Sequence, residues 1–106
     1  YFDWVVTVAF YSAIHLLEGK ILPCKVGIQE CKNIQEVREA YNLKGRHVAR
    51  FKLIERFAPP EISIGYKWLD DRSRYARYIT FKIDNAVSDK AVRHLNDIHK
   101  YCTQKN

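Results

Sequence analysis

The 106-residue chain has the length of one domain, and its 47% hydrophobic and 13% aromatic residues are enough to form a core, which excludes a wholly disordered protein. Its 18 Lys and Arg residues outnumber its 12 Asp and Glu residues, and the net charge of +6 favours an anionic partner. No apolar run reaches the roughly 18 residues that a membrane span requires, so we expect no membrane contact.

The first predicted element is a helix over residues 3–22, which Pro23 ends. Apolar side chains almost encircle this helix. A narrow polar stripe interrupts them and consists of Asp3, Thr7, Tyr11, His15 and Glu18. A helix with so much apolar surface is buried on more than one side. We therefore expect it to lie at the centre of the domain or to face a second subunit as well.

The next part of the chain, residues 25–44, has the least clear pattern and contains a marginal helix over 29–42. A helix over 46–58 follows, and the two prolines after it end it. Its inward face is expected to consist of Val48, Phe51, Ile54 and Ala58.

The C-terminal part of the chain predicts two more helices. The first covers residues 61–81, and its apolar face is expected to contain Ile62, Tyr66, Leu69, Ala76 and Ile79. Residues 80–83 alternate like a short strand. Ser88 has the character of an N-cap, with Asp89 in the first turn of a last helix that ends near Cys102. Without βαβ alternation or a repeat, the chain predicts a single all-α domain, a four- to five-helix up-and-down antiparallel bundle.

The three cysteines favour reduced thiols over a disulfide framework, because their number is odd. The six residues between Cys24 and Cys31 do not fit a zinc-binding spacing, so we expect no metal and no cofactor. The start of the chain lacks the basic segment of a secretory signal, and we expect a cytoplasmic protein. The chain contains no Met, so we also expect that residues precede Tyr1.

The positive charge is concentrated in two of the predicted helices. Residues 44–57 carry a net charge of +4 and residues 67–82 carry +3, so the rest of the chain is nearly neutral. The second segment also places Trp68, Tyr75 and Tyr78 among its arginines. Basic groups neutralise phosphates and aromatic rings stack on bases, which suits single-stranded nucleic acid. The alternative is an ordinary helix surface, on which opposite charges such as Asp70 and Arg74 pair at i,i+4.

Two histidines are candidates for acid–base chemistry. His15 lies one turn from Glu18, and a neighbouring carboxylate orients an imidazole and raises its basicity. The alternative is a buried histidine whose hydrogen bonds are satisfied. His47 and Arg50 share a helical face at i,i+3 and would offer a base beside a phosphate clamp, unless that face is only a solvated basic surface. The sequence lacks the motifs of common hydrolases, nucleotide triphosphatases and dehydrogenases.

Three blocks of the sequence follow one another in an order typical of a known family. The first is a D-W pair followed by small and apolar residues, an aromatic pair and a histidine, from Asp3-Trp4 to His15. The second is an H-x-x-R motif within Gly45-Arg46-His47-Val48-Ala49-Arg50. The third is Tyr66-Lys67-Trp68-Leu69 followed by Ser73-Arg74-Tyr75-Ala76-Arg77-Tyr78. Together they cover about half of the chain and resemble the HEPN-like domains of bacteria and archaea. The resemblance implies a four- or five-helix bundle that commonly forms a homodimer.

Many HEPN proteins are metal-independent ribonucleases with an R-x4–6-H motif, and Arg93 and His99 in the last predicted helix fit it, with His94 after the arginine. The resemblance implies that the histidine deprotonates or orients a 2′-hydroxyl while the arginine stabilises charge on phosphorus, which yields a 2′,3′-cyclic phosphate. Residues six apart on a regular helix point about 120° apart, so this pair would converge only between protomers or at a distorted turn. The resemblance also implies a toxin or defence role, with an antitoxin or another protein as partner.

The resulting hypothesis is a homodimeric RNA-binding protein that either binds RNA alone or also cleaves it without a metal. The expected catalytic residues are Arg93, His99 and His47. The residues expected to bind RNA or a nucleotide are Arg46, Arg50, Arg74, Arg77 and Tyr78. The alternative is a non-catalytic dimerisation module that binds a nucleotide or protein through its basic face. In that case a structural polar network would hold the helices in register, formed by His15, Glu18 and Tyr66 together with His47, Arg50 and Arg77. A third hypothesis is a subunit whose basic face docks an acidic protein.

Overall fold

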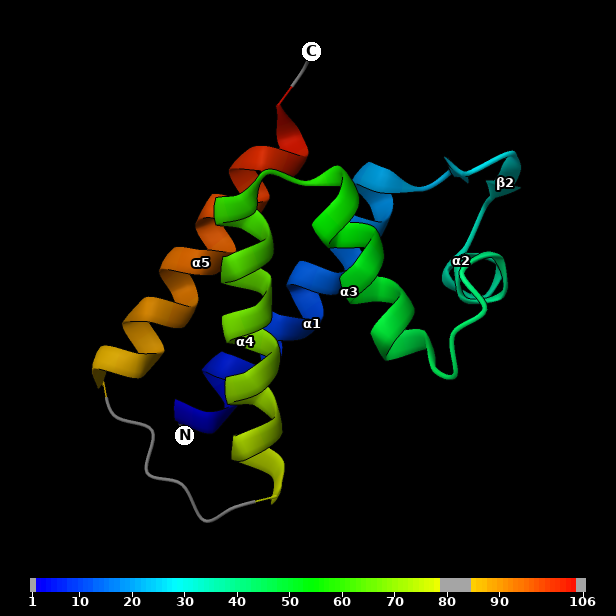
Figure 1. The fold of residues 1–106 in the computed structure, drawn as a ribbon. Coiled ribbons are helices and arrows are strands. Elements are labelled where there is room, and N and C mark those ends of the chain that lie inside the picture. The colour runs from blue at the N-terminus through cyan, green and yellow to red at the C-terminus, as the bar shows by residue number, and fades with distance from the viewer. Residues whose placement is uncertain (1, 79–84, 105–106) are drawn as a thin grey trace.

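The computed structural model describes residues 2–78 and 85–104, which form five helices and one small hairpin (Figure 1). In chain order the elements are α1 (Phe2–Ile21), β1 (Cys24–Val26), β2 (Gln29–Cys31), α2 (Ile34–Ala40), α3 (Arg46–Phe57), α4 (Pro60–Tyr78) and α5 (Asn85–Thr103). The all-α fold predicted from the sequence is therefore confirmed. The one addition within these residues is the antiparallel pair of β1 and β2. No helix in the described ranges combines the length and the apolar character of a membrane span.

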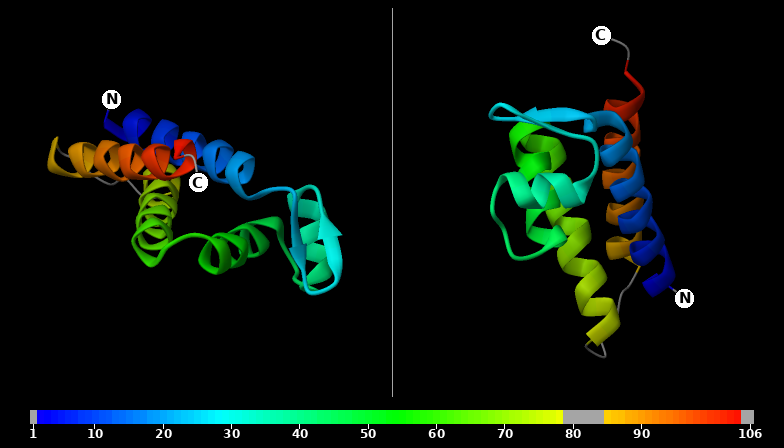
Figure 2. Two further views of the ribbon diagram at one scale, coloured as in Figure 1. Left: turned by 90° about the horizontal axis from the view of Figure 1, so that it is seen from above. Right: turned by 90° about the vertical axis from the view of Figure 1, so that its right-hand side faces the viewer.

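Three helices form the main body of the domain. α1 and α5 lie side by side and run in the same direction, while α4 packs against both and runs the opposite way (Figure 1). Seen from above, α3 lies beyond α4, and the hairpin and α2 form an arm at the far end (Figure 2). The short connection at Pro59 turns the chain back, so α3 and α4 are antiparallel neighbours.

The hydrophobic core lies where α1 meets α4 and α5. The buried side chains of α1 are Val6, Ala9, Phe10, Ala13, Ile14, Leu17 and Ile21. From α4, the fully buried Tyr66 places its ring 5.6 Å from that of Phe10 and 6.4 Å from that of Phe51, measured between centroids. The first helix thus packs against both long C-terminal helices, while Trp4, Val8 and Tyr11 on its other side stay exposed.

The hairpin replaces the first part of the marginal helix expected over 29–42, so that prediction is wrong there. Gly27 has a φ of +63° and is the first residue of a two-residue turn, a geometry typical of a type II′ hairpin. The turn aligns Cys24 directly opposite Cys31. Helix α2 begins only after the hairpin, where the side chain of Asn33 accepts a hydrogen bond of 2.9 Å from the backbone N–H three residues later.

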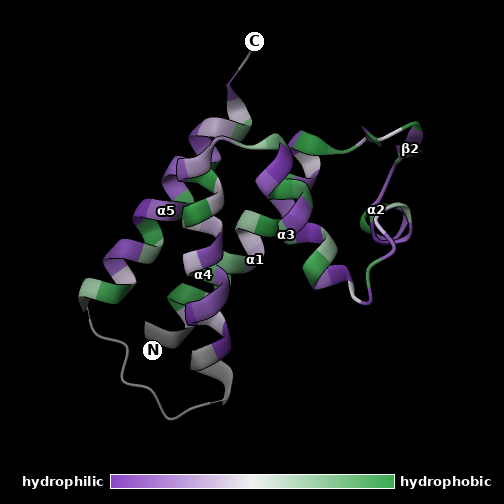
Figure 3. Ribbon diagram, viewed as in Figure 1, coloured by the Kyte–Doolittle hydropathy of each residue, from purple (hydrophilic) through white to green (hydrophobic). Residues whose placement is uncertain are grey.

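The face that α3 buries differs from the expected one. In Figure 3 hydrophilic and hydrophobic residues alternate along α3, α4 and α5, as they do in amphipathic helices. The prediction is wrong at Val48, whose side chain is 52% exposed. Ile54 and Ala58 are buried as expected, and Ala49 and Leu53 are buried in addition, because α3 packs against α2 as well as α4.

The expected start of the last helix is also wrong. α5 begins at Asn85, three residues before Ser88, and Ser88 is buried within the first turn instead of capping the helix. On α4, Ile62, Tyr66 and Leu69 are buried as expected. The predicted strand at 80–83, the residue Ile79 and the side chain of Ala76 lie outside what the structure describes.

The close approach of α4 and α5 depends on Gly65. A Cβ atom at this position would lie 2.9 Å from Nδ1 of His94, whose ring is held against Trp68 with 5.1 Å between centroids. We expect Gly65→Ala to lower the free energy of unfolding by up to about 2 kcal/mol, because overpacking outweighs the gain of about 1 kcal/mol in helix propensity. Urea denaturation measures this change.

The matched control is Gly19→Ala on α1. Apart from the backbone of its own helix and its chain neighbours, no described atom would lie within 4 Å of a Cβ at Gly19, and the residue is exposed. This variant should gain about 0.5–1 kcal/mol from helix propensity alone. An equal gain in Gly65→Ala would contradict the tight contact between α4 and α5.

Candidate functional site

A buried carboxylate lies at the contact between α3 and α4. Asp70 is only 1% exposed, and the spacing of α4 places it on the buried face one turn from Tyr66 and Ser73. Nε2 of His47 on α3 lies 2.9 Å from Oδ2 of Asp70, at ion-pair distance but not aligned for a hydrogen bond. Arg74 donates from Nε to Oδ1 of Asp70 at 3.2 Å. We call the following residues the α3–α4 cluster: His47, Arg50, Tyr66, Asp70, Ser73 and Arg74.

The imidazole of His47 lies in a strongly cationic environment. Its pKa is lowered from the ordinary 6.5, first by burial and then by the charges of Arg74, Arg50 and Lys67, while Asp70 opposes the shift. The ring is therefore neutral at pH 7. Its side chain is 38% exposed, so a substrate can reach it. A neutral, accessible imidazole next to a carboxylate is a suitable general base.

A second ion pair connects the cluster to α1. Arg50 donates from Nε to Oε2 of Glu18 at 3.2 Å. Burial strongly raises the pKa of Tyr66, and Arg50 is close enough to oppose that shift. Of the polar network expected from the sequence, Glu18 and Tyr66 thus meet around Arg50. His15 does not join them, because it is exposed on the side of α1 that faces α5.

Two buried hydroxyl groups in the cluster have unused hydrogen-bonding capacity. Oη of Tyr66 and Oγ of Ser73 are buried and have no hydrogen-bond partner in the described residues. Buried polar groups are usually satisfied, and exceptions concentrate at functional or strained sites. Ser73 was not among the site residues predicted from the sequence, and Asp70 was considered only as part of an i,i+4 surface pair with Arg74. The signal that could have found both is their i,i+4 and i,i+7 spacing from Tyr66 on the apolar face of α4.

The residues expected to bind RNA divide into two groups. Arg50 and Arg74 lie close enough to His47 to influence its pKa, and Arg46 is exposed next to it in the sequence of α3. The side chains of Arg77 and Tyr78 lie outside what the structure describes. Lys67 joins the first group: its Nζ lies 3.3 Å from Asp71 and 5.4 Å from the centroid of the Phe51 ring. The cationic side chains of this group thus lie beside the carboxylates of Asp70 and Asp71 and the ring of Phe51.

The expected catalytic pair on α5 does not meet in one protomer. Helix α5 continues through Arg93 and His99, so their side chains leave it about 120° apart. His99 instead shares a pocket of about 520 Å³ between α1 and α5, which we call the histidine pocket. It is lined by Ser12, His15, Leu16, Leu95, Asn96 and His99. His47, the third expected catalytic residue, belongs to the α3–α4 cluster.

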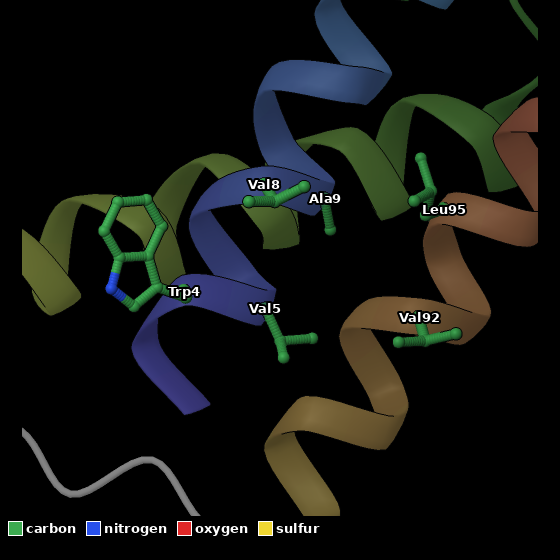
Figure 4. A pocket seen from close by; sticks show the side chains of 6 residues that line it. All are labelled: Trp4, Val5, Val8, Ala9, Val92 and Leu95. Atoms are coloured by element: carbon green, nitrogen blue, oxygen red, sulfur yellow. The ribbon is translucent and has the colours of Figure 1, made fainter. Parts of the chain in front are cut away.

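An apolar groove lies between α1 and α5 at the end nearer the N-terminus (Figure 4). It has a volume of about 400 Å³ and is lined by Trp4, Val5, Val8, Ala9, Val92 and Leu95. Trp4 is 72% exposed, and Val8 is 53% exposed. Between Trp4 and Leu17, α1 contains no Lys, Arg, Asp or Glu residue. A surface this apolar on an exposed helix is typical of an interaction face.

Neither metal ligands nor known relatives add to this description. Among the described residues, no group of three His, Cys, Asp or Glu side chains is placed to hold a metal ion. The resemblance to HEPN-like domains rests on the three sequence blocks alone. No family model, curated protein or solved structure matches this chain.

Proposed function

We propose that this chain is a HEPN-like, dimeric RNA-binding domain that cleaves single-stranded RNA without a metal, with His47 as the general base. The observation that carries the proposal is the environment of His47. A neutral, partly open imidazole lies 2.9 Å from a buried carboxylate and within the field of Arg50, Lys67 and Arg74. Cations attract the phosphate backbone, and the carboxylate stabilises the protonated form of the ring.

In this mechanism, His47 takes the proton of a 2′-hydroxyl, whose oxygen then attacks the adjacent phosphorus. The bond from phosphorus to the 5′-oxygen breaks, and the leaving oxygen takes a proton from water. The products are a 2′,3′-cyclic phosphate and a 5′-hydroxyl. Arg74 and Arg50 each use Nε in an ion pair, and the terminal nitrogens of a guanidinium remain donors for the charge that develops on the phosphate oxygens.

The test is incubation with a single-stranded RNA in excess EDTA, followed by analysis of the cleaved ends. The expected result is cleavage that leaves a 2′,3′-cyclic phosphate. A DNA strand of the same sequence should bind but stay intact, because it lacks the 2′-hydroxyl. Binding of RNA without cleavage would leave a non-catalytic RNA-binding module, and no binding of either strand would overturn the proposal altogether.

Arg46→Ala tests whether the RNA lies against α3. We expect weaker RNA binding and a plot of log affinity against log salt whose slope is smaller by about 0.7, because one phosphate contact is lost. Fluorescence anisotropy at several salt concentrations measures both. Arg93→Ala is the matched control, since Arg93 is also exposed but lies on α5. A larger effect of Arg93→Ala would move the RNA-binding face to α5.

The homodimer in this proposal uses the apolar side of α1. Trp4, Val8 and Tyr11 form an exposed ridge at i,i+4 and i,i+7, directly beside the groove lined by Val5 and Val92. A face that carries both a ridge and a groove can pair with its own copy about a two-fold axis. The absence of charge along this part of α1 means that no like charges would meet in such a pair.

Val8→Glu should disrupt this dimer. Two carboxylates buried at a two-fold interface repel each other, so we expect the dimer dissociation constant to rise at least about tenfold. Sedimentation equilibrium measures it. Val48→Glu is the matched control, because Val48 on α3 is 52% exposed, nearly the same as the 53% of Val8. A wild-type chain that stays monomeric at high concentration would assign this face to a different protein and overturn the homodimer.

A further inference from the structure

Two cysteines lie opposite each other in the hairpin at the end of the arm, which Figure 1 shows beside α2. Cys24 and Cys31 are directly paired in the register of β1 and β2. Directly opposed residues of an antiparallel pair project from the same face, with Cα atoms about 4.5–5.5 Å apart. This separation lies within the range of about 4.4–6.8 Å that a disulfide bridges. Both thiols are free in this structure.

We propose that Cys24 and Cys31 are a redox site that forms an intramolecular disulfide by exchange with a low-molecular-weight disulfide such as glutathione disulfide. This inference is independent of RNA binding and of the α3–α4 cluster. It identifies a modification site on the arm, where β2 packs against α2 and α2 packs against α3.

The two thiols differ in access, which sets the order of the reaction. Cys31 is fully buried, whereas Cys24 is only partly buried. The thiolate of Cys24 therefore attacks glutathione disulfide first, forms a mixed disulfide and releases one glutathione. Cys31 then gives its proton to solvent and attacks the sulfur of Cys24, which releases the second glutathione. The protein loses two protons and two electrons, and one glutathione disulfide takes up both pairs and is reduced to two glutathione molecules.

The surroundings of the thiols predict the pH dependence of this reaction. Burial raises the pKa of Cys24, the neighbouring Cys31 raises it further, and the positive charge of Arg56 opposes the shift. Burial also raises the pKa of Cys31, with Glu36 as the second cause. Both groups are thiols at neutral pH, so the exchange is slow there. The rate should increase about tenfold per pH unit, because the thiolate fraction does so below the pKa.

The experiment treats the wild-type chain with glutathione disulfide at pH 7 and pH 8 and follows intact mass and linked peptides. The expected product is a chain that has lost two hydrogens, with Cys24 bonded to Cys31. Cys102→Ser should give the same product. Cys31→Ser should retain one glutathione on Cys24, whereas Cys24→Ser should stay unmodified at position 31, because Cys31 is buried.

Three outcomes would overturn the inference. The first is a disulfide that includes Cys102. The second is a wild-type chain that keeps a stable glutathione adduct and forms no internal disulfide. The third is a Cys24→Ser chain whose Cys31 is modified as fast as the wild type is oxidised. The wild-type result stands without the variants, so a variant that fails to fold does not affect it. Circular dichroism of each variant identifies any such failure.

Discussion

His47→Ala is expected to lower kcat for RNA cleavage by about 10²- to 10⁴-fold, the usual contribution of a positioned general base. The imidazole is the side chain that combines access from solvent, a neutral ring at pH 7 and a carboxylate 2.9 Å away. Single-turnover cleavage with saturating enzyme and excess EDTA measures the chemical step. RNA binding should change much less, because His47 is uncharged before the reaction.

The control for this prediction is His99→Ala. His99 lies in the histidine pocket between α1 and α5, apart from the α3–α4 cluster. It should retain most of the activity. The opposite pattern, with activity lost in His99→Ala and kept in His47→Ala, would place the chemistry on α5 and contradict the role of His47.

The pH profile is an independent readout of the same residue. The pKa of His47 is lowered by burial and by neighbouring cations, so the base form is present at pH 6.5 and activity should fall only below that value. The negative charge of Asp70 favours the protonated ring. Its removal in Asp70→Asn should therefore lower the pKa further and move the acidic limb of kcat/KM to lower pH. A shift to higher pH would contradict the coupling between the two groups.

Tyr66→Ala is expected to have the largest effect on stability. The ring is fully buried between Phe10 and Phe51, so its loss leaves a cavity at the junction of α1, α3 and α4. Truncation of a buried aromatic side chain lowers the free energy of unfolding by about 3–5 kcal/mol. A domain of this size has a total of roughly 5–15 kcal/mol, so the variant should be close to unfolding. Urea denaturation of the wild type and the variant measures the difference.

Tyr66→Phe separates the ring from the hydroxyl. The hydroxyl is buried and has no hydrogen-bond partner in the described residues, although Arg50 is close enough to influence its pKa. Removal of an unsatisfied polar atom should leave stability unchanged or raise it by up to about 1 kcal/mol. A loss of more than about 1 kcal/mol would show that Arg50 donates to this oxygen. It would then support the polar network that the sequence predicted around Tyr66.

Helix positions could be predicted where the local sequence decides them. Pro23 and the pair Pro59-Pro60 lie at or just beyond helix ends, because proline lacks an N–H and clashes with the preceding turn. The long apolar run of α1 indicated a helix with more than one packing partner, and α1 packs against both α4 and α5. The hairpin around Gly27 was missed, since its turn depends on a single positive φ and its strands have only three residues each.

Burial was harder to predict than helix position. Val48 was assigned to the core from its spacing, but α3 has neighbours on two sides, and the burial of Ala49 and Leu53 depends on α2 as well as α4. Asp70 was read as half of an ordinary surface pair with Arg74. Its carboxylate is buried because α3 covers that side of α4, and this contact joins residues more than twenty positions apart.

The sequence by itself determined the all-α class, the approximate positions of the long helices and the concentration of positive charge on residues 44–57 and 67–82. These properties depend on composition and on local periodicity, which are readable along the chain. Tertiary structure alone decided which of the charged and polar side chains lie together. It brought His47 to Asp70 and Arg74, placed His99 beside His15 in the histidine pocket, and left the apolar side of α1 exposed, because each of these depends on contacts between distant segments.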